Sequence, residues 1–440
     1  MQNLNIPESK KERVVIIGGG FGGLTIAKKL STEEFQVVLI DKHNYHTFQP
    51  LLYQVATAGL EPDSIAYPLR KIFQKKKEFY FRVACAEEID EEGGILRTDR
   101  GNVRFDHLII ATGSTTNYFG NVKIQSHSMP MKSLPEALDL RSLILQNFEA
   151  SLLTSNLHER ERLMNYVIVG GGPTGVELAG SLGELKLHVL PQDYPDLDFR
   201  RMSIHLLEAS PRLLNGMSDR ASELAKKGLE KLHVQVWTDT MVKDYDGEKV
   251  STVNKELPAS TLIWAAGVTG VIFKGIPDSS IERGRIKVDE FNRVNGMKNV
   301  YAVGDVAVML TDKTPKGHPM VAPVAVQQGK LLTKNLIRQR KGQALKPFSY
   351  FNKGSMATIG RNKAVVDFAG MHIGGFAAWL IWMFIHLMEL VGFRNRLVAL
   401  VNWSTSYFSY DRGIRLIVRP FNRTTKKVEE DVHTNVPTDE

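Results

Sequence analysis

One stretch near the start of the chain carries residue types that could bind a dinucleotide. Residues 14–17 form a short apolar run rich in β-branched side chains, which predicts a buried parallel strand. Gly18, Gly20 and Gly23 follow with the spacing Gly-x-Gly-x-x-Gly, and residues 24–30 favour a helix. Glycines permit a tight turn and let backbone N–H groups approach a pyrophosphate, and the helix N-terminus adds partial positive charge. A glycine triplet alone indicates no more than a tight turn, but between a strand and a helix it favours a dinucleotide site.

An acidic side chain supplies the second part of this predicted site. A second apolar run, residues 37–40, ends in Asp41, whose carboxylate could accept hydrogen bonds from ribose hydroxyls. Residues 106–110 predict another strand, which leads into a turn of small residues where backbone can pass close to a bound dinucleotide. The residues that we expect to contact this first nucleotide are Gly18, Gly20, Phe21, Gly22, Gly23, Asp41, Lys42, Ala111, Thr112 and Gly113.

The same pattern recurs later in the chain. Residues 166–169 predict another apolar strand, Gly170, Gly172 and Gly175 repeat the glycine spacing, and a helix containing Glu177 follows. Two glycine triplets, each followed by its own acid, imply two nucleotides. The simplest interpretation is one tightly held flavin nucleotide and one exchanging nicotinamide nucleotide.

An acid also ends the strand that follows the second triplet. Residues 203–207 predict this strand and lead to Glu208, after an interval lengthened by residues 186–201, which we expect to form an inserted loop. Glu208 favours NADH over NADPH, because a 2′-phosphate would meet like charge, whereas the nearby Arg212 weakens that preference. Residues 262–267 add a strand and a turn of small residues. We expect the second nucleotide to contact Gly170, Gly172, Pro173, Thr174, Gly175, Glu177, Glu208, Ala266 and Gly267.

A later segment returns to the first unit. Residues 299–305 predict a strand followed by Gly304 and Asp305, and residues 323–336 predict a helix with Pro323 near its first turn. An acid after a glycine at a strand end could accept hydrogen bonds from a ribityl chain, although an ordinary turn is the alternative. We therefore expect the second unit to be inserted within the first.

Composition limits the chemistry. The chain has 440 residues, enough for two or three domains, and a formal net charge of +8. Its single cysteine, Cys85, excludes intramolecular disulfides, a Cys-x-x-Cys redox pair and a cysteine-rich metal site, and we predict no metal site. Residues 1–12 are polar and lack the apolar core of a secretory signal, which favours chemistry that faces the cytosol.

The C-terminal region combines apolar and basic residues. Residues 376–393 contain only His386 and Glu389 as ionisable side chains, and a membrane span needs about 20 apolar residues, so this run is borderline. The two side chains would share one helix face, which favours a helix lying against a membrane over one crossing it. Residues 394–427 contain eight Lys or Arg and one acid among apolar side chains, which suits an anionic membrane surface. The alternative is a dimer interface or a lid over the flavin domain.

These motifs resemble those of flavoproteins with two dinucleotide-binding domains, and closely those of the type II NADH dehydrogenases, which are single-chain NADH:quinone oxidoreductases. The resemblance covers nearly the whole chain. Its general part is the two glycine triplets, Ala111-Thr112-Gly113 and Gly304-Asp305, and its more specific part is segments 48–53, 175–180, 322–327 and 353–361. Segment 322–327 is similar to the family's quinone-site pattern Ala-Gln-x-Ala-x-Gln. Pro323 replaces the first glutamine, which leaves Gln327 as the candidate for that site.

The resemblance implies a reaction and its cofactors. NADH would pass a hydride to non-covalently bound FAD, which would pass two electrons to a membrane quinone, either ubiquinone or menaquinone. Gly304, Asp305 and Ala325 would join the FAD contacts. Helix N-terminal amides near Val324 and Ala325 would stabilise negative charge on reduced flavin.

The resemblance also implies roles for two polar side chains. Glu177 matches the family's acid near the junction of nicotinamide, flavin and quinone, and Gln327 would lie at the quinone edge of the flavin. The alternatives are a helix-dipole partner in the first turn for Glu177 and a helix-surface amide for Gln327.

We therefore predict a flavoenzyme on the cytoplasmic face of the inner or cell membrane, peripheral or anchored by its C-terminal helix. We expect a homodimer that neither pumps protons nor binds nucleic acid. The expected fold is α/β, with two Rossmann-like dinucleotide-binding domains and a C-terminal membrane-docking helical region. The expected segments are an FAD-binding part at 1–120, an NADH-binding domain at 121–290, an FAD-binding return at 291–345, a membrane-association region at 346–430 and a disordered tail at 431–440. The alternatives are a soluble NAD(P)H-dependent flavoprotein reductase with a ferredoxin-like protein acceptor and an NADH-binding redox sensor.

Overall fold

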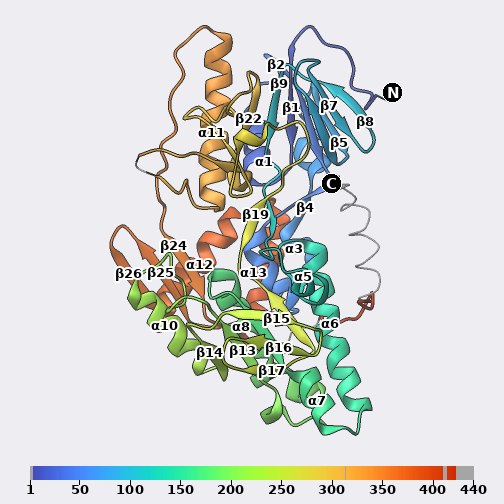
Figure 1. The fold of residues 1–440 in the computed structure, drawn as a ribbon, viewed down its shortest axis with the longest axis vertical. Coiled ribbons are helices and arrows are strands. Elements are labelled where there is room, and N and C mark those ends of the chain that lie inside the picture. The colour runs from blue at the N-terminus through green and yellow to red at the C-terminus, as the bar shows by residue number, and fades with distance from the viewer. Residues whose placement is uncertain (1–2, 313, 410–413, 423–440) are drawn as a thin grey trace. The chain divides into compact units, whose positions relative to one another are not determined.

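Two parallel sheets organise the chain, one in each of two units (Figure 1). The structure is a computed structural model that describes residues 3–312, 314–409 and 414–422. Unit 1 is made of residues 1–47, 66–115 and 268–353, and unit 2 of residues 48–65, 116–267 and 354–440. Each unit is built from three segments, which alternate along the chain with those of the other unit. The predicted α/β fold, with one dinucleotide-binding unit inserted in the other, is confirmed. The predicted tail at 431–440 lies outside the described residues.

The sheet of unit 1 has the strand order β22-β9-β1-β2-β5. These strands are Val300–Ala302 (β22), His107–Ile110 (β9), Glu12–Ile17 (β1), Phe35–Asp41 (β2) and Phe79–Val83 (β5). Strands β1, β2 and β9 are apolar and buried almost throughout, as expected where both faces of a sheet are covered. The register pairs Ile17 with both Ile40 and Ile110. The turn after Ile17 therefore begins at the same sheet edge as Asp41 and Ala111.

Two helices of unit 1 lie side by side, α1 (Phe21–Lys29) and α11 (Ala322–Arg340), as Figure 1 shows. A Cβ at Gly329 would lie 2.9 Å from the carbonyl oxygen of Gly22, so the two backbones approach too closely for a larger side chain. Pro323 stands in the first turn of α11, where a missing N–H costs nothing. The predicted helix at 323–336 is confirmed and continues to Arg340.

The core of unit 1 joins its parallel sheet to a smaller antiparallel sheet. Val15 and Leu108 from the parallel sheet share one buried cluster with Leu96 and Val103 from the antiparallel one. The smaller elements of unit 1 are β3 (Tyr45–Thr47), β4 (Ala66–Pro68), α4 (Leu69–Phe73), β6 (Ala86–Asp90), β7 (Ile95–Thr98), β8 (Gly101–Arg104), β20 (Ile281–Glu282), β21 (Arg285–Lys287) and β23 (Ala307–Val308).

Unit 2 repeats the parallel arrangement with the strand order β11-β18-β12-β13-β14. These strands are Met129–Pro130 (β11), Thr261–Trp264 (β18), Tyr166–Val169 (β12), Ile204–Leu207 (β13) and Val234–Trp237 (β14). Its other elements include α2 (Leu52–Ala56), α3 (Pro62–Ile65), α5 (Val122–His127), α6 (Leu134–Leu153), α7 (Leu157–Met164), α8 (Pro173–Glu184), α10 (Asp219–Glu230), β15 (Val242–Tyr245), β16 (Lys249–Thr252) and β17 (Glu256–Pro258). Val169 pairs with both Leu207 and Trp264, so the second glycine turn also begins at a shared strand edge.

The inserted loop predicted at 186–201 is wrong in part. The chain continues from α8 through a π-helical turn, Leu185–Val189, and then the short helix α9, Leu190–Asp193. The buried side chains of Leu185, Val189 and Leu190 extend the apolar face of α8, which favours continued helix over loop. Pro191, one of the two prolines of this segment, stands in the first turn of α9, where a helix tolerates it.

The C-terminal part of unit 2 is an antiparallel sheet followed by two helices. The sheet is formed by β24 (Ser355–Thr358), β25 (Ala364–Phe368) and β26 (Met371–Gly375), and the helices are α12 (Phe376–Glu389) and α13 (Phe393–Ser409). The expected single apolar element at 376–393 is wrong, because α12 ends at Glu389 and Gly392, with φ +90°, turns the chain into α13. Among the described residues, no helix has both the length and the apolar character to cross a membrane.

Several arginines of the predicted basic region are ion-paired inside unit 2. The pairs are Arg394 with Asp63, Arg415 with Asp193 and Arg419 with Asp139. Arg394 and Arg419 remain largely exposed, so their pairs contribute little to stability and leave the guanidinium groups accessible. The remaining basic residues of that prediction, apart from Arg396, lie outside the described residues: Arg412, Arg423, Lys426 and Lys427.

Candidate functional site

In the first glycine turn, the protein's own packing requires glycine at two positions but not at the middle one. Gly18 has φ +100°, and a Cβ there would lie 2.3 Å from the carbonyl oxygen of Ala111. A Cβ at Gly23 would lie 1.9 Å from the carbonyl oxygen of Gly18, because α1 starts directly on the turn. A Cβ at Gly20 would meet no protein atom within 4 Å. A glycine in open space at the middle position fits a backbone that a ligand approaches closely.

Asp41 is held at this turn by two backbone amides. Its Oδ2 accepts a hydrogen bond from the N–H of Gly19 at 2.5 Å, and its Oδ1 accepts one from the N–H of His43 at 2.7 Å. Burial raises the pKa of Asp41, and these two hydrogen bonds oppose that shift. Each carboxylate oxygen keeps a second lone pair, so the group can still accept ribose hydroxyls. Lys42, which follows, is exposed.

The ring of Phe21 is placed by a buried histidine. His46 donates from Nδ1 to the carbonyl oxygen of Gly19 at 2.8 Å, and burial lowers its pKa to about 4. The two rings meet edge-on with their centroids 5.4 Å apart. A neutral, hydrogen-bonded His46 therefore supports the glycine turn.

Three small residues from distant parts of unit 1 meet beside α11. A Cβ at Gly304 would lie 3.1 Å from the Cβ of Ala325, and one at Gly22 would lie 3.6 Å from the carbonyl oxygen of Ala325. The N–H groups of Val324 and Ala325 reach the carbonyl oxygen of Val321 at 3.1 and 3.4 Å, so the first turn of α11 already occupies the amides that the prediction assigned to flavin.

Ser114 and Gln328, two residues that the sequence did not single out, hold Asp305 and Gly304 by hydrogen bonds. Ser114 donates from Oγ to Asp305 Oδ2 at 2.5 Å. The N–H of Gly304 donates to Oε1 of Gln328 at 2.7 Å, and Gln328 is buried. Thr112, at the end of β9, donates from Oγ1 to the carbonyl oxygen of Val271 at 2.7 Å. The only sequence signal for Gln328 is its position beside Gln327.

The side-chain amide of Gln327 binds the backbone of Phe351, which lies in the same unit. Its Nε2 donates to the carbonyl oxygen of Phe351 at 2.9 Å, and its Oε1 accepts the N–H of Phe351 at 3.0 Å. This bidentate pair gives the amide a structural role, so a ligand that used Gln327 would have to replace both bonds.

The second glycine turn in unit 2 repeats the first. Gly170 has φ +110°, and a Cβ there would lie 2.5 Å from the carbonyl oxygen of Ala265, beside Ala266 and Gly267. A Cβ at Gly175 would lie 1.9 Å from the carbonyl oxygen of Gly170. A Cβ at Gly172 would meet nothing within 4 Å, so the middle position is again open. Pro173 and Thr174 follow as exposed residues in the first turn of α8.

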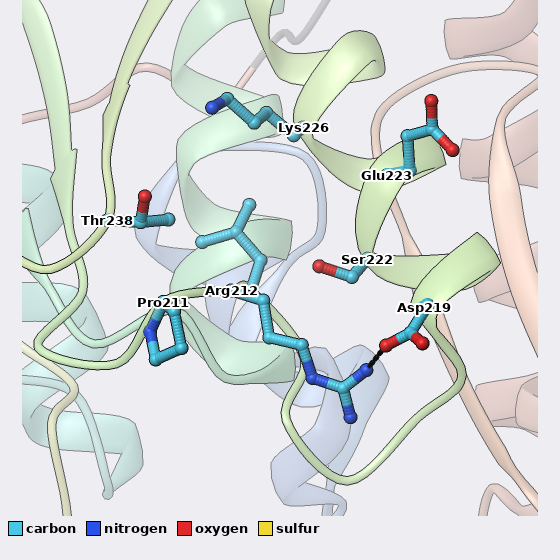
Figure 2. Close-up of a pocket in the computed structure, with 8 residues that line it drawn as sticks. Pro211, Arg212, Asp219, Ser222, Glu223, Lys226 and Thr238 are labelled. Atoms are coloured by element: carbon cyan, nitrogen blue, oxygen red, sulfur yellow. Dashed lines mark hydrogen bonds and ion pairs between the residues drawn. The ribbon is translucent and has the colours of Figure 1, made fainter.

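Glu208 has the same relation to the second turn as Asp41 has to the first. Its Oε2 accepts the N–H of Gly171 at 2.5 Å, and its Oε1 accepts the N–H of Ser210 at 2.8 Å. Beyond it lies a cavity of about 260 Å³, which Figure 2 shows lined by Pro211, Arg212, Leu213, Asp219, Ser222, Glu223, Lys226 and Thr238. Within this cavity the guanidinium of Arg212 is ion-paired with Asp219 (Figure 2). The same guanidinium donates to the carbonyl oxygen of Met217 at 3.0 Å.

Glu177 lies in the interior of unit 2 and not in the first turn of α8, which contains no acid. The expected alternative of a helix-dipole partner in the first turn is therefore wrong. The side chain is 7% exposed, and its Oε1 accepts the N–H of Thr358 at 3.2 Å. Burial raises the pKa of Glu177 to about 8, so most of the carboxyl is protonated at neutral pH.

A chain of hydrogen bonds leads from helix α13 toward Glu177. Trp403 donates from Nε1 to Oε1 of Gln54 at 2.8 Å, and Gln54 donates from Nε2 to the hydroxyl of Tyr53 at 2.9 Å. The Tyr53 hydroxyl lies 3.1 Å from Oγ1 of Thr358, and either oxygen could be the donor. The backbone N–H of Thr358 donates to Oε1 of Glu177, so these hydrogen bonds connect α13 to the residue that contacts Glu177. Tyr53 and Thr358 lie in the quoted segments 48–53 and 353–361, whereas the sequence analysis assigned no role in this site to Gln54 or Trp403.

Helix α12, the first of the two C-terminal helices, contributes a neutral histidine to the same region. His386 stacks on Trp382 with ring centroids 4.1 Å apart and meets Phe48 edge-on at 6.0 Å. Its Nδ1 donates to the carbonyl oxygen of Trp382 at 2.8 Å. Burial lowers the pKa of His386 to about 4, so α12 carries no charge there at neutral pH.

The fold and the paired nucleotide turns define a pyridine nucleotide-disulphide oxidoreductase, and the model of that family matches residues 12–329. A second family model, the NDH2 C-terminal domain, matches residues 352–410. The type II NADH:quinone oxidoreductases Ndh and NdhA of Mycobacterium tuberculosis are 34% and 37% identical to the chain, which they match over 92% of its length and 90% and 88% of their own. The chain belongs to the type II NADH:quinone oxidoreductase family.

The fold is also that of a solved relative. The structure of NDH2 from Plasmodium falciparum in complex with NADH aligns with a TM-score of 0.85 at 22% identity, over 93% of this chain and 100% of that one. The disulphide of the broader family's name has no counterpart here, because the chain has one cysteine. Cys85 is half-buried, and burial raises the pKa of its thiol.

The middle glycines give the sharpest test of the two sites. Gly20→Ala and Gly172→Ala each add a methyl group where no protein atom lies within 4 Å, so both variants are expected to fold, with the melting temperature of the cofactor-free protein unchanged. We expect Gly20→Ala to lose bound flavin absorbance and Gly172→Ala to keep it while its KM for NADH rises about tenfold or more.

Gly23→Ala and Gly175→Ala are the matched controls, because their methyl groups would collide with backbone and lower the melting temperature. If both middle-glycine variants retained flavin and the original KM, these turns would not be the nucleotide sites.

Burial of Glu177 predicts a pH dependence of stability. The folded pKa of about 8 lies above the ordinary value of about 4.3, so the folded state keeps a proton that the unfolded state loses. This contribution is complete below about pH 4 and disappears as the pH rises through 8. Glu177→Gln removes it, so the melting temperature of the unmodified holoenzyme should fall more steeply from pH 6 to 9 than that of the variant. If the melting temperatures of the two proteins changed equally with pH, Glu177 would be ionised in the folded chain.

Proposed function

We propose that the chain is a non-proton-pumping NADH:quinone oxidoreductase that holds FAD non-covalently in unit 1 and binds NADH in unit 2. The observation that carries this proposal is the duplicated turn, with an open middle glycine and an amide-held acid in each unit. Membership of the type II NADH:quinone oxidoreductase family supports it. When bound, FAD supplies the hydride-accepting and electron-donating chemistry, and the protein orients and tunes it.

The residues of unit 1 suit a tightly held dinucleotide. Backbone amides from Gly20 to Gly23 would face the pyrophosphate, and the carboxylate of Asp41 would accept ribose hydroxyls. Asp305, fixed by Ser114, would accept hydroxyls of the ribityl chain. The remaining proposed contacts are Gly18, Phe21, Gly22, Lys42, Ala111, Thr112, Gly113, Gly304 and Ala325.

The residues of unit 2 suit NADH more than NADPH. Glu208 places negative charge where a 2′-phosphate would bind. Arg212, the cation that could offset it, is already ion-paired with Asp219. The remaining proposed contacts are Gly170, Gly172, Pro173, Thr174, Gly175, Glu177, Ala266 and Gly267.

Glu177 and Gln327 are the proposed residues of the quinone reaction. Reducing a quinone consumes two protons, and a buried carboxyl with a pKa of about 8 holds a proton at neutral pH. Gln327 would contact the quinone only after releasing Phe351.

The two C-terminal helices are the proposed membrane-docking surface. They expose large apolar side chains, namely Phe376, Leu380, Phe384, Ile385, Met388, Phe393, Leu397, Leu400 and Val401. An apolar helix face beside accessible arginines suits an anionic lipid surface and gives access to a quinone dissolved in lipid. We further infer a homodimer on the cytoplasmic face of the inner or cell membrane, as the family resemblance implies.

Stopped-flow flavin absorbance of the holoenzyme in liposomes tests the function. We expect NADH to bleach the flavin rapidly and added quinone to restore it rapidly. The Glu177→Gln variant is expected to bleach at the unmodified rate once NADH is saturating and to slow the quinone-dependent recovery. Fast bleaching without recovery in the unmodified enzyme would contradict a quinone acceptor and favour a protein acceptor.

Vesicle binding tests the docking surface. Phe384 and Phe393 are 63% and 81% exposed, so replacing both with serine removes apolar contact without disturbing the core. We expect the double variant to bind vesicles containing anionic lipid at least about tenfold more weakly in co-sedimentation. Leu153→Ser, at an 89% exposed position on α6, is the matched control and should bind normally. Equal binding by the double variant would refute the proposed surface.

A further inference from the structure

The strand order of unit 2 determines which half of a dinucleotide lies over which strands. The chain passes from β12 to β13 and β14 on one side and then crosses to β18 on the other. A dinucleotide binds where this order reverses, at the carboxyl ends of β12 and β18. Glu208 follows β13 and takes the ribose of the adenosine half. The nicotinamide half therefore extends over the end of β18.

An aromatic side chain stands at that end of β18. A Cβ at Gly267 would lie 2.9 Å from Cζ of Phe119, so the ring covers the small-residue turn that follows β18. The ring meets Trp264, the last residue of β18, edge-on at 6.4 Å. Phe119 is nevertheless 67% exposed, so most of its ring is free to contact a ligand.

Hydrogen bonds hold the segment that carries this ring against β18. The N–H of Asn117 donates to the carbonyl oxygen of Gly267 at 3.1 Å, and Trp264 donates from Nε1 to the carbonyl oxygen of Asn117 at 2.8 Å. The side chain of Asn117 accepts the N–H of Phe119 at 2.8 Å. The segment is thus fixed on both sides of the turn.

The backbone of Phe119 is strained. Its φ of +52° lies in the left-handed region, which a bulky residue rarely adopts. Such strain persists only where surrounding structure imposes it, and it concentrates at functional sites. An exposed apolar ring gains little from burial that would offset the strain, so folding alone does not explain a phenylalanine at this position.

We propose that Phe119 is the wall against which the nicotinamide ring of NADH packs in unit 2. The proposal rests on NADH being the electron donor, as proposed above. An aromatic ring offers a flat apolar surface to the reduced nicotinamide and attracts the cationic ring of NAD⁺ through its π face. Phe119 thereby orients the nicotinamide half of the dinucleotide, while Glu208 binds the adenosine half.

Calorimetric titration of the oxidised holoenzyme with NAD⁺ and with ADP-ribose separates the two halves, because ADP-ribose lacks the nicotinamide. We expect Phe119→Ala to weaken NAD⁺ binding about fivefold and to leave ADP-ribose binding within about twofold. Val122→Ala, at a 74% exposed position three residues further on, is the matched control and should change neither affinity.

Phe119→Gly distinguishes a binding role from a structural one. Glycine adopts the left-handed conformation without strain, so this variant should melt at a higher temperature than Phe119→Ala. Both variants lack the ring and should bind NAD⁺ equally weakly. The role of Phe119 would be overturned if Phe119→Gly, the more stable variant, bound NAD⁺ more tightly than Phe119→Ala. It would also be overturned if NAD⁺ affinity did not change, or if NAD⁺ and ADP-ribose binding weakened equally. Failure of the unmodified holoenzyme to bind either ligand would overturn the proposed function and this proposal together.

Discussion

In each unit, the close approach between the first and third glycines of the glycine turn determines where the following helix starts. In unit 1 and in unit 2, a Cβ on the third glycine would lie 1.9 Å from the carbonyl oxygen of the first. Each helix therefore starts directly on the end of its strand, with its N-terminal amides facing the sheet edge. Parallel pairing then places an acid and a small-residue turn at the same edge. The positions of the glycine turn, the acid and the small-residue turn therefore follow from this backbone packing.

The two glycine turns have nearly the same geometry, so the residues around each turn must determine which nucleotide stays bound and which exchanges. In unit 1, Gly304 and Asp305 return from late in the chain and are held by Gln328 and Ser114, which suits a permanently bound cofactor. In unit 2, an open cavity lies beyond Glu208, which suits a ligand that exchanges. Within unit 2, polar side chains connect the helix α13 to the residue that contacts the buried Glu177.

Local pattern was enough to predict the strands, both glycine turns, the two terminal acids and the helix at 323–336. Features that depend on tertiary contacts were missed or misjudged. The helical turns at 185–193 form because their apolar side chains extend the face of α8, and the break before Phe393 depends on a single left-handed glycine. The burial of Glu177 and the strained backbone of Phe119 depend on residues far away in sequence, so no local periodicity reports them.

The division of the two turns between a resident and an exchanging nucleotide is the central claim. The most direct test measures flavin released per chain on denaturation, together with NAD⁺ bound per chain by the same desalted holoenzyme in equilibrium dialysis. The account predicts one FAD and one NAD⁺ per chain, with NAD⁺ binding that leaves the flavin in place. Two flavins per chain, or NAD⁺ that displaces the flavin, would contradict it.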